Sequence, residues 1–331
     1  MIDPKTVSVV IPTYNRADLL KNALDSVLAQ TYPIHEIIVV DDGSTDDTRD
    51  VVWRYNREHS IPVRYIHQEN QGQAAARNKG IEVATGEWVA FLDSDDTWHA
   101  NKIEAQFVAL ERYGWRCGAC FTDAHFTNND SMPAPTVFGL AGLKWEPVYG
   151  FVLDPVRDAV RSHLPVWVQT LLVDAALVRK VKFDPELRFD EDADLVFRLA
   201  LQTAFCFVNA RLVEIDRTPL ANRPAKLWDQ PKVLLENDQR CYEKWLKLSE
   251  HLNGDVHAAV LSHLRDTHSA WANWHLLRGE YPQARKAMNA AMKYGPWSYG
   301  PAIKWALTWF TPRLARKVVN KYAKQYVPNH Y

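Results

Sequence analysis

Cysteine is scarce in this sequence, with four residues in a chain of 331. That is too few for the disulfide framework of a small secreted domain, so we expect a reducing compartment. Cys117 and Cys120 form a CxxC pair, but they fall in a strand predicted over 117–121, on which their side chains would point to opposite faces. No second CxxC or histidine pair follows at zinc spacing. Two core cysteines are therefore expected here rather than a zinc site.

Long apolar runs are also missing. No stretch approaches the roughly 20 apolar residues that a membrane-spanning helix needs. The first apolar run, 7–11, is short and follows Asp3 and Lys5, unlike a signal peptide. The net charge of −1 gives no field that would attract nucleic acid. We expect a cytoplasmic protein that is soluble or lies on the cytoplasmic face of a membrane and binds no nucleic acid.

Two glycine-rich nucleotide-binding motifs are absent as well. A nicotinamide-dependent oxidoreductase needs a GxGxxG turn after a strand, where glycine lets the backbone approach the pyrophosphate. A P-loop enzyme needs GxxxxGK followed by serine or threonine. The sequence contains neither pattern, which argues against both classes of protein.

What the sequence does contain is an alternation of strand and helix patterns in its first half. Strand-like runs at 7–11, 37–40, 63–67 and 88–92 alternate with helix-like apolar spacing at 17–30, 46–56, 74–84 and 101–113. This alternation predicts an α/β fold in which a Rossmann-like, mainly parallel sheet is flanked by helices. Ligands bind beyond the carboxyl ends of the strands in such sheets.

The second half is organised differently. Five prolines over 128–165 indicate loops around short elements, and a helix-like segment at 192–203 leads into a strand at 206–208. After that the pattern becomes helical, and this part holds seven of the thirteen tryptophans. We therefore expect a first domain over 1–225 and an α-helical C-terminal region over 226–331.

One segment of that helical region, 276–296, is similar to the second helix of a tetratricopeptide-type unit. Only one such unit is visible, and repeats of this kind need stacked neighbours to bury their apolar faces. We therefore expect a local helical hairpin rather than a repeat array.

A pair of aspartates follows the fourth predicted strand. Asp93 and Asp95, separated by Ser94, form a DxD motif in a tight turn. Two carboxylates at this spacing can converge on a hard divalent cation such as Mg²⁺ or Mn²⁺. Such a cation would stabilise the charge that grows on the diphosphate leaving a sugar nucleotide. The alternative is a helix N-terminus, with Asp96 as the cap of the helix predicted at 101–113.

Another acidic pair, Asp41 and Asp42, ends the second predicted strand. A carboxylate in this place can accept hydrogen bonds from a nucleobase imide or from ribose hydroxyls. The alternative is turn and cap chemistry with Gly43 and Ser44, in which Ser44 is the N-cap of the helix predicted at 46–56.

Two further charged features lie on predicted helices. Arg77 can donate hydrogen bonds to a diphosphate, unless it is a solvated arginine on a helix face. Asp190, Glu191, Asp192 and Asp194 place four carboxylates in five positions, which is electrostatically costly unless a cation or a donor offsets it. One of them can act as a general base toward an acceptor hydroxyl. The alternative is a solvated helix start.

Five motifs occur in a fixed order: Val-Ser-Val-Val-Ile-Pro-Thr-Tyr-Asn-Arg (7–16), Asp-Asp-Gly-Ser-Thr-Asp (41–46), Asn-Gln-Gly-Gln-Ala-Ala-Ala-Arg-Asn-Lys-Gly (70–80), Ala-Thr-Gly-Glu-Trp-Val-Ala-Phe-Leu-Asp-Ser-Asp-Asp (84–96) and Glu-Asp-Ala-Asp-Leu-Val-Phe-Arg (191–198). In combination they strongly resemble family 2 glycosyltransferases, which have the GT-A fold. Five motifs in the family's order are far more specific than any one alone, and the resemblance covers roughly 5–220.

The resemblance implies an inverting, single-displacement glycosyltransferase that takes its sugar from a nucleotide diphosphate donor, most commonly a UDP-sugar. Cell-surface polysaccharide or another glycan would be the product, and the acceptor would be a glycan or a lipid-linked molecule. Pro12 and Tyr14 would line the nucleoside pocket. Asp42 would pair with the base, with Asp41 beside it.

The resemblance also implies roles for the reacting groups. Asp93, Ser94 and Asp95 would bind ribose, diphosphate and Mn²⁺ or Mg²⁺, with Asp95 the more certain metal ligand and Asp93 the second. Asp192 would be the catalytic base, and Glu191 would support it or contact the acceptor. The alternative is a non-catalytic sugar-nucleotide-binding or scaffold homologue. Because every expected catalytic position is filled, we favour the enzyme.

The C-terminal tail is basic and aromatic, with no acidic residue after Glu280. A helix of this composition fits the surface of an anionic leaflet, where it would bring the enzyme to a lipid-linked acceptor. The alternative is that the aromatic side chains form the tail's own core. The basic residues are Arg285, Lys286, Lys293, Lys304, Arg313, Arg316, Lys317, Lys321 and Lys324, and the aromatic ones are Trp297, Tyr299, Trp305, Trp309 and Phe310.

Overall fold

The computed structural model describes residues 5–128, 136–142, 148–161, 164–217, 230–252 and 254–295, together with Thr308 and Val319. The chain divides into two compact units, Met1–Leu220 and Ala221–Tyr331. The domain boundary predicted near residue 225 lies outside the described residues.

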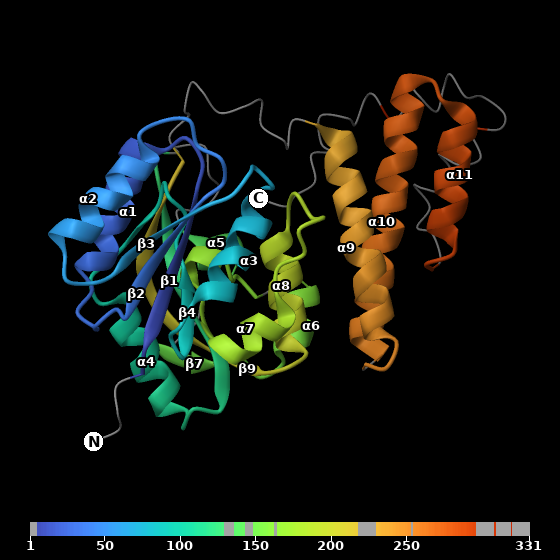
Figure 1. The fold of residues 1–331 in the computed structure, drawn as a ribbon. Helices are drawn as coiled ribbons and strands as arrows, with labels where there is room; N and C mark the ends of the chain where they lie inside the picture. The colour runs from blue at the N-terminus through green and yellow to red at the C-terminus, as the bar shows by residue number, and fades with distance from the viewer. Residues whose placement is uncertain are drawn as a thin grey trace. The chain divides into compact units, whose positions relative to one another are not determined.

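The first unit is built around a sheet that has nine strands among the described residues. Their order is β3-β2-β1-β4-β8-β6-β9-β5, with β7 beside β9. Figure 1 shows the sheet between two groups of helices. The strands are β1 (Val7–Thr13), β2 (Glu36–Asp41), β3 (Val63–His67), β4 (Trp88–Phe91), β5 (Thr97–Trp98), β6 (Cys117–Thr127), β7 (Tyr149–Phe151), β8 (Leu172–Asp174) and β9 (Ala204–Asp216).

The strands of this sheet run in both directions. β1 is parallel to β2 and β4, and β2 is parallel to β3, so these four strands end at the same edge. β8 lies antiparallel between β4 and β6, whereas β5 and β7 are antiparallel to β9. The predicted α/β fold with helices flanking the sheet is confirmed, but the sheet is mixed rather than mainly parallel. The sequence did not predict β5, β7 and β8, because two or three residues are too few to show an alternation.

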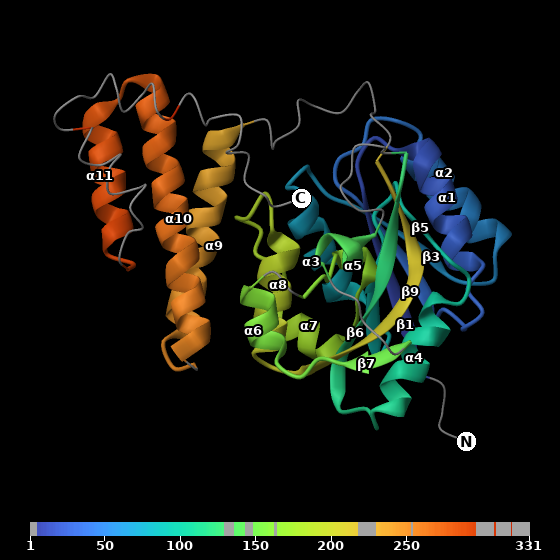
Figure 2. The ribbon, with the colours of Figure 1, turned by 180° about the vertical axis from the view of Figure 1, so that it is seen from behind.

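Helices cover both faces of the sheet, as the two opposite views in Figures 1 and 2 show. One core lies under α1, α2 and α4, and the other lies under α3, α6, α7 and α8. The helices are α1 (Ala17–Leu28), α2 (Thr48–Glu58), α3 (Gln73–Val83), α4 (Lys102–Arg112), α5 (Val137–Leu140), α6 (Pro155–Val160), α7 (Ala175–Val181) and α8 (Glu191–Ala200), with a 3₁₀ turn at Val168–Thr170.

Side chains of β1 alternate between these two cores. Val7, Val9 and Ile11 belong to the core under α1, and Val10 belongs to the core under α3. Because both faces are buried, the strand is a continuous apolar run rather than an alternating one, which is typical of parallel strands in the middle of a sheet.

Helix α3 lies unusually close to β1. A Cβ atom added at Gly80 would come within 2.3 Å of Val10 Cγ1, so only glycine fits at this position. Gly80 follows Arg77 by about one helical turn. The close contact therefore fixes the depth at which α3 carries Arg77 toward the end of the sheet.

The CxxC pair does not lie as the sequence predicted. Cys117 and Cys120 both face the core under α1, together with Cys206 of β9, so the prediction of opposite faces was wrong. The register between β6 and β9 shifts between Cys117 and Ala119, and such a bulge reverses the alternation of side chains along a strand. All three are buried thiols without a disulfide.

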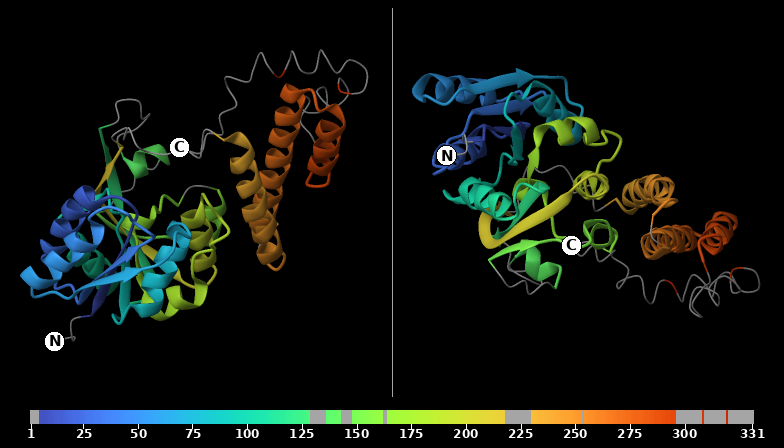
Figure 3. Two further views of the ribbon diagram at one scale, coloured as in Figure 1. Left: turned by 45° about the horizontal axis from the view of Figure 1, so that its top comes forward. Right: turned by 90° about the horizontal axis from the view of Figure 1, so that it is seen from below.

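The second unit has three helices among its described residues: α9 (Pro231–Ser249), α10 (Gly254–Arg278) and α11 (Tyr281–Met292). Figure 3 shows them side by side within the unit. α10 and α11 are joined at Gly279 and share a small apolar core that includes Ala272, Leu276 and Met288. This arrangement agrees with the helical hairpin predicted for 276–296.

Among the described residues, no helix is long and apolar enough to cross a bilayer. Most of the basic and aromatic tail, 296–331, lies outside the described residues. The membrane contact expected of that tail therefore stays a prediction.

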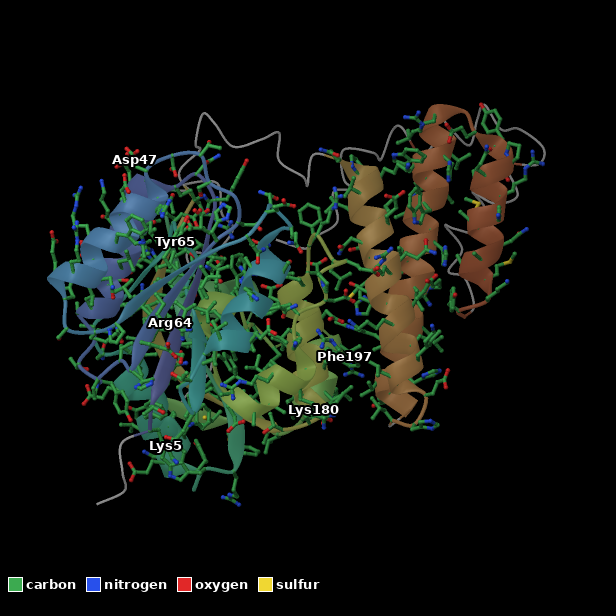
Figure 4. All side chains as sticks on the ribbon, viewed as in Figure 1. Lys5, Asp47, Arg64, Tyr65, Lys180 and Phe197 are labelled. Atoms are coloured by element: carbon green, nitrogen blue, oxygen red, sulfur yellow. The ribbon has the colours of Figure 1, made fainter. Side chains whose placement is uncertain are left out.

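A buried carboxylate joins the strands at the other edge of the sheet, where β2 begins. The Glu36 carboxylate accepts hydrogen bonds from Ser8 Oγ (2.7 Å), Arg64 Nη1 (2.8 Å) and both the backbone N–H and Oγ1 of Thr85 (2.7 and 2.6 Å). Figure 4 labels Arg64 on β3. Burial by itself would raise the pKa of Glu36, but these donors outweigh it and lower the pKa to about 2.

We expect Glu36→Gln to lower the free energy of unfolding at pH 7 by about 3 kcal/mol, because the lowered pKa is a measure of how strongly the folded state holds the charged form. That stabilisation is present above the ordinary carboxyl pKa of 4.5 and is lost as the pH falls toward about 2. Urea unfolding of both proteins at several pH values measures it.

The difference in the free energy of unfolding between wild type and Glu36→Gln should therefore decrease as the pH falls from 4.5 to 2. Glu82→Gln, on the exposed surface of α3, serves as a control and should change stability by less than about 0.5 kcal/mol. A difference in the free energy of unfolding that stays constant with pH would contradict the lowered pKa of Glu36.

Candidate active site

The predicted site residues follow the carboxyl ends of β1, β2 and β4 and lie near the first turns of α3 and α8. Because β1, β2 and β4 are parallel, these residues share one edge of the sheet. In Figure 4 this edge lies toward Asp47, and Lys5 marks the opposite end of the strands.

The turn after β1 is held by the segment that follows β2. Asn15 has a left-handed backbone (φ 51°), its N–H donates to Ser44 Oγ (2.8 Å), and its Oδ1 accepts from the Thr45 N–H (2.7 Å). Ser44 was predicted as the N-cap of α2, and that prediction was wrong. α2 begins later, at Thr48 after Asp47, and the Ser44 hydroxyl is engaged by Asn15 instead.

Asp41 is buried and takes part in turn chemistry. Its Oδ1 accepts from the Ser44 N–H (2.8 Å), and its Oδ2 accepts from the hydroxyl of Tyr65 (2.6 Å), which Figure 4 labels on β3. Burial and the Asp41 carboxylate both raise the pKa of Tyr65. The hydrogen bond therefore keeps Tyr65 neutral and Asp41 in place.

Asp42 is buried and holds the start of α3. Its Oδ1 accepts from Gln68 Nε2 (2.7 Å) and the Gln71 N–H (2.9 Å), and its Oδ2 accepts from the Gly72 N–H (2.8 Å). Gly72 has a φ of 89° and directly precedes the helix. The structure thus gives Asp42 a cap-like function, and its pairing with a nucleobase stays a prediction.

The two residues predicted to line a nucleoside pocket differ in exposure. Pro12 is buried within β1, whereas Tyr14 is 48% exposed just beyond the strand. Thr13 between them is buried, and its Oγ1 has no hydrogen-bond partner in the structure. A buried hydroxyl without a partner is uncommon in proteins. It offers a polar contact at the place where the nucleoside was predicted.

Arg77 connects two of the acidic motifs. Its guanidinium is buried, and Nη1 donates to Glu191 Oε1 (2.7 Å) while Nη2 donates to Asp93 Oδ1 (2.7 Å). Its Nε has no hydrogen-bond partner. The alternative of a solvated arginine is therefore wrong. Direct contact with a diphosphate stays a prediction.

Glu191 is the buried end of this connection. It accepts hydrogen bonds from Arg77 and from Gln73 Nε2, which lies one turn earlier on α3. Burial raises the pKa of Glu191 to about 7, although the charge of Arg77 acts in the opposite direction. Glu191 is thus a structural partner of Arg77 in this state of the protein.

Asp192, the predicted catalytic base, is the next residue on α8. It is half-buried, and its Oδ1 accepts from the Ala193 N–H (2.8 Å). Burial and the negative charge of Asp190 raise its pKa to about 6, while Arg77 opposes the rise. A carboxylate with this pKa is ionised at neutral pH and is a better base than an ordinary aspartate.

The DxD turn after β4 carries a second arginine. Asp95 Oδ1 pairs with Arg16 Nη1 at 2.8 Å, and Ser94 beside it is buried. Each carboxylate of the motif thus faces a guanidinium, since Asp93 pairs with Arg77.

Asp96 does not cap α4, so that alternative was wrong. The helix starts at Lys102 with Asn101 as its N-cap, because the short strand β5 intervenes. Asp96 is buried and accepts from Gln169 Nε2 (2.7 Å) and the Asp216 N–H (3.0 Å). Burial and the charges of the preceding carboxylates raise its pKa. It ties the DxD turn to the end of β9.

The carboxylates of the DxD turn suit a cation whose remaining ligands come from a bound substrate. Among the described residues, no group of three or more histidine, cysteine, aspartate or glutamate side chains is placed to hold a metal ion. Mg²⁺ and Mn²⁺ are bound by one or two carboxylates when phosphate oxygens and water complete the shell. Asp93 and Asp95 fit that arrangement and do not fit a closed structural metal site.

Sequence reasoning missed three contributors to the site: Asn15, Arg16 and Gln73. Asn15 and Arg16 directly follow β1, and their position beyond a strand's carboxyl end was the available signal. Gln73 lies four residues before Arg77 on α3, so both side chains share one face of the helix and reach Glu191.

Comparison with known sequences gives a family match over the first unit. Residues 8–165 match the sequence model described as Glycosyl transferase family 2. TuaG of Bacillus subtilis, provisionally named a teichuronic acid biosynthesis glycosyltransferase, is 44% identical over 129 residues, or 38% of this chain and 50% of that protein. An uncharacterised glycosyltransferase of Rickettsia felis is 32% identical over 210 residues, or 63% of this chain and 32% of that protein. The chain thus spans between a third and a half of these relatives.

Solved structures share the fold at low sequence identity. TarS of S. aureus, residues 1–349, superposes with a TM-score of 0.68 at 18% identity, covering 97% of this chain and 91% of that one. The mannosyltransferase PcManGT of Pyrobaculum calidifontis, in complex with GDP-Man and Mn²⁺, gives a TM-score of 0.56 at 18% identity, covering 98% and 89%. These likenesses confirm the predicted fold.

We expect Arg77→Met to lower the free energy of unfolding by about 3–5 kcal/mol, because it leaves the buried Glu191 carboxylate and Asp93 without their shared cation. Urea unfolding followed by circular dichroism measures the loss. Arg77→Lys, which keeps the charge with fewer donors, should be intermediate.

Lys79→Met on the same helix is the matched control. Lys79 forms an exposed pair with Glu82 at 3.6 Å, and its removal should cost less than about 0.5 kcal/mol. Similar losses for the Arg77 and Lys79 variants would show that Arg77 does not hold the site together.

Proposed function

We propose that this chain is an inverting glycosyltransferase of family 2, the family whose sequence model matches residues 8–165. Its reaction transfers a sugar from a nucleotide diphosphate donor to an acceptor hydroxyl. The observation that carries this proposal is the single guanidinium of Arg77, which contacts Asp93 after β4 and Glu191 at the start of α8. That contact puts the proposed leaving-group site beside the proposed base, Asp192.

The proposed donor site lies where β1 and β2 end. Asp41 and Asp42 are rigidly placed there, and the unpartnered Thr13 hydroxyl lies between Pro12 and Tyr14. A nucleoside bound at this edge directs its diphosphate toward the DxD turn, because β1 lies between β2 and β4. Related folds support a nucleotide donor, since TarS is known in complex with UDP and with UDP-GlcNAc. A UDP-sugar is therefore the first donor to test.

Asp95 and Asp93 are the residues proposed to hold Mn²⁺ or Mg²⁺, with Asp95 as the principal ligand. When bound, the cation would neutralise charge on the departing diphosphate. PcManGT, a protein of similar fold, has been solved with Mn²⁺. The protein's own contribution is to keep these two carboxylates on one turn, which the buried Asp96 fixes against β9.

The proposed role of Asp192 is to accept the proton of the acceptor hydroxyl. The acceptor oxygen then forms a bond to the anomeric carbon as the bond from that carbon to the diphosphate oxygen breaks. Attack from the side opposite the diphosphate inverts the configuration. Glu191 is held by Arg77 and Gln73, so it positions the start of α8 and with it Asp192.

For the acceptor and the cellular setting we propose only a chemical class and a location. A glycan or lipid-linked acceptor in cell-surface polysaccharide synthesis is supported by the name given to TuaG. Such an acceptor would place the enzyme at the cytoplasmic face of a membrane. The basic aromatic tail would then bring it to that surface.

The pH dependence of turnover tests Asp192 as the base. With a UDP-sugar and an accepted glycan, we expect the rate to rise as the pH rises through about 6, because only the ionised Asp192 accepts a proton. Asp192→Asn should lower the rate by roughly 10²–10⁴-fold and remove this limb of the profile. Release of UDP measures the rate.

Asp50→Asn, an exposed carboxylate on α2, is the control for this experiment and should keep both the rate and the profile. Full turnover by Asp192→Asn would rule out the proposed base. A non-catalytic homologue would bind the donor without any turnover by the wild type.

Thermal unfolding in the presence of nucleotides tests the donor site. Mn²⁺ with UDP at about 100 times its Kd should stabilise the protein by roughly 2.7 kcal/mol, because the ligand binds only the folded form. EDTA should remove most of this effect, and Asp95→Asn should do the same. Equal stabilisation by ADP, GDP and UDP, unaffected by EDTA, would count against a specific sugar-nucleotide site.

A further inference from the structure

Both carboxylates of the DxD turn are paired with an arginine, and the two pairs differ in how firmly they are held. Arg77 contacts Asp93 at 2.7 Å, and Arg16 contacts Asp95 at 2.8 Å. The side chain of Arg77 is only 2% exposed, whereas that of Arg16 is 32% exposed. A partly exposed arginine side chain can change its rotamer without displacing packed neighbours.

Arg77 has no room to leave Asp93. It is on the buried face of α3, and its two Nη atoms are bound by Asp93 and Glu191 on opposite sides. Moving the guanidinium would leave two carboxylates without their cation in a buried place, which is costly. The pair of Arg77 and Asp93 is therefore a fixed part of the site.

Arg16 combines an anchored backbone with a partly exposed side chain. The residues on either side of it are anchored, since the Asn15 N–H donates to Ser44 Oγ (2.8 Å) and the Ala17 N–H donates to Asp46 Oδ2 (3.0 Å). Arg16 itself precedes the first turn of α1. Its guanidinium thus reaches Asp95 from a well-defined backbone position.

Arg16 and a divalent cation compete for the same carboxylate. A guanidinium at 2.8 Å from Asp95 repels a cation approaching that oxygen, so the ion pair opposes cation binding in the absence of a donor. A diphosphate changes the balance, because its oxygens are good partners for a guanidinium and also complete the cation's shell.

We propose that Arg16 is a positioning residue that occupies Asp95 in the free protein and moves to the donor's diphosphate when cation and donor bind together. This inference rests on the proposed function, because it takes Asp95 as the principal cation ligand. The consequence is that cation and nucleotide each strengthen the binding of the other. Such coupling is reciprocal by thermodynamic necessity.

The exchange also separates the roles of the two aspartates. In this exchange the cation takes the place of Arg16 at Asp95, whereas Asp93 keeps its contact with Arg77. In the DxD motif, Asp95 therefore changes its partner when the cation binds, and Asp93 keeps its partner.

The test is the binding of Mn²⁺, followed through the electron paramagnetic resonance signal of the free ion, with and without UDP. We expect Arg16→Gln to bind Mn²⁺ alone about fivefold more tightly than the wild type does, which is the worth of a partly exposed ion pair. UDP should bind more weakly to the variant. The increase in Mn²⁺ affinity caused by UDP should be about fivefold smaller than in the wild type.

Arg49→Gln is the matched control, because it removes the same charge from the nearby first turn of α2 without touching Asp95. It should bind Mn²⁺ as the wild type does. Equal tightening in both variants would reduce the effect to net charge and overturn the inference. Arg16→Lys, which keeps the charge with a shorter reach, should lie between wild type and Arg16→Gln.

The outcomes separate this inference from the proposed function. If the wild type binds Mn²⁺ with UDP and Arg16→Gln behaves identically, the role of Arg16 is overturned while the metal site stands. If neither protein binds Mn²⁺, with or without UDP, the metal-assisted mechanism fails and the inference fails with it. Circular dichroism spectra that match the wild type establish that each variant is folded.

Discussion

The whole site depends on the need to neutralise one buried guanidinium. Arg77 cannot be left without partners inside the protein, because an uncompensated buried charge costs several kcal/mol. Its partners are Asp93, which follows β4, and Glu191, which starts α8. These two residues are far apart in the sequence and have no backbone hydrogen bonds that would bring them together. The two ion pairs of Arg77 therefore join the DxD turn to α8, the helix that carries Asp192. The close approach of Gly80 to Val10 sets how far Arg77 reaches.

Under the proposed function, the same interaction prepares the site for a diphosphate and a cation. Asp93, Asp95 and Glu191 face two arginines, which offset part of the negative charge at this place in the free protein. A diphosphate adds negative charge beside them, and without a divalent cation that charge would be repelled by the DxD turn. Under the proposed function, a metal would offset this surplus of carboxylates once a donor is bound. It does not require a preformed cage of metal ligands, which the described residues do not contain.

The sequence predicted where the chemistry lies better than how its groups are paired. Positions such as Asp42 and Asp93 could be placed because a strand pattern ends just before them, and parallel strands end at one edge. The partners could not be placed, because a side chain's contact depends on the exact path of each turn. Ser44 was predicted to cap α2 and instead accepts from Asn15. Cys117 and Cys120 were predicted on opposite faces but share one, because a bulge leaves no clear mark in a sequence. The strands β5, β7 and β8 were missed, because two or three residues are too few to show a period.

Helix α3 connects the contacts of the site, because it touches Asp42, the acidic groups around Arg77 and the segment that leads to α8. Its start is held by Asp42, which follows β2. The Asp42 carboxylate accepts a hydrogen bond from the N–H of Gly72, the residue before α3. Its middle carries Arg77 into the acidic groups. The next residue, Asn78, pairs with both the N–H and the C=O of Phe183 (2.8 and 2.9 Å), in the segment that leads to α8. A helix is rigid over this distance, so the proposed donor edge and the start of α8, which carries the proposed base Asp192, are both tied to one element. An enzyme that displaces a diphosphate in line needs such a fixed arrangement, because the attacking oxygen and the departing one must lie on opposite sides of one carbon.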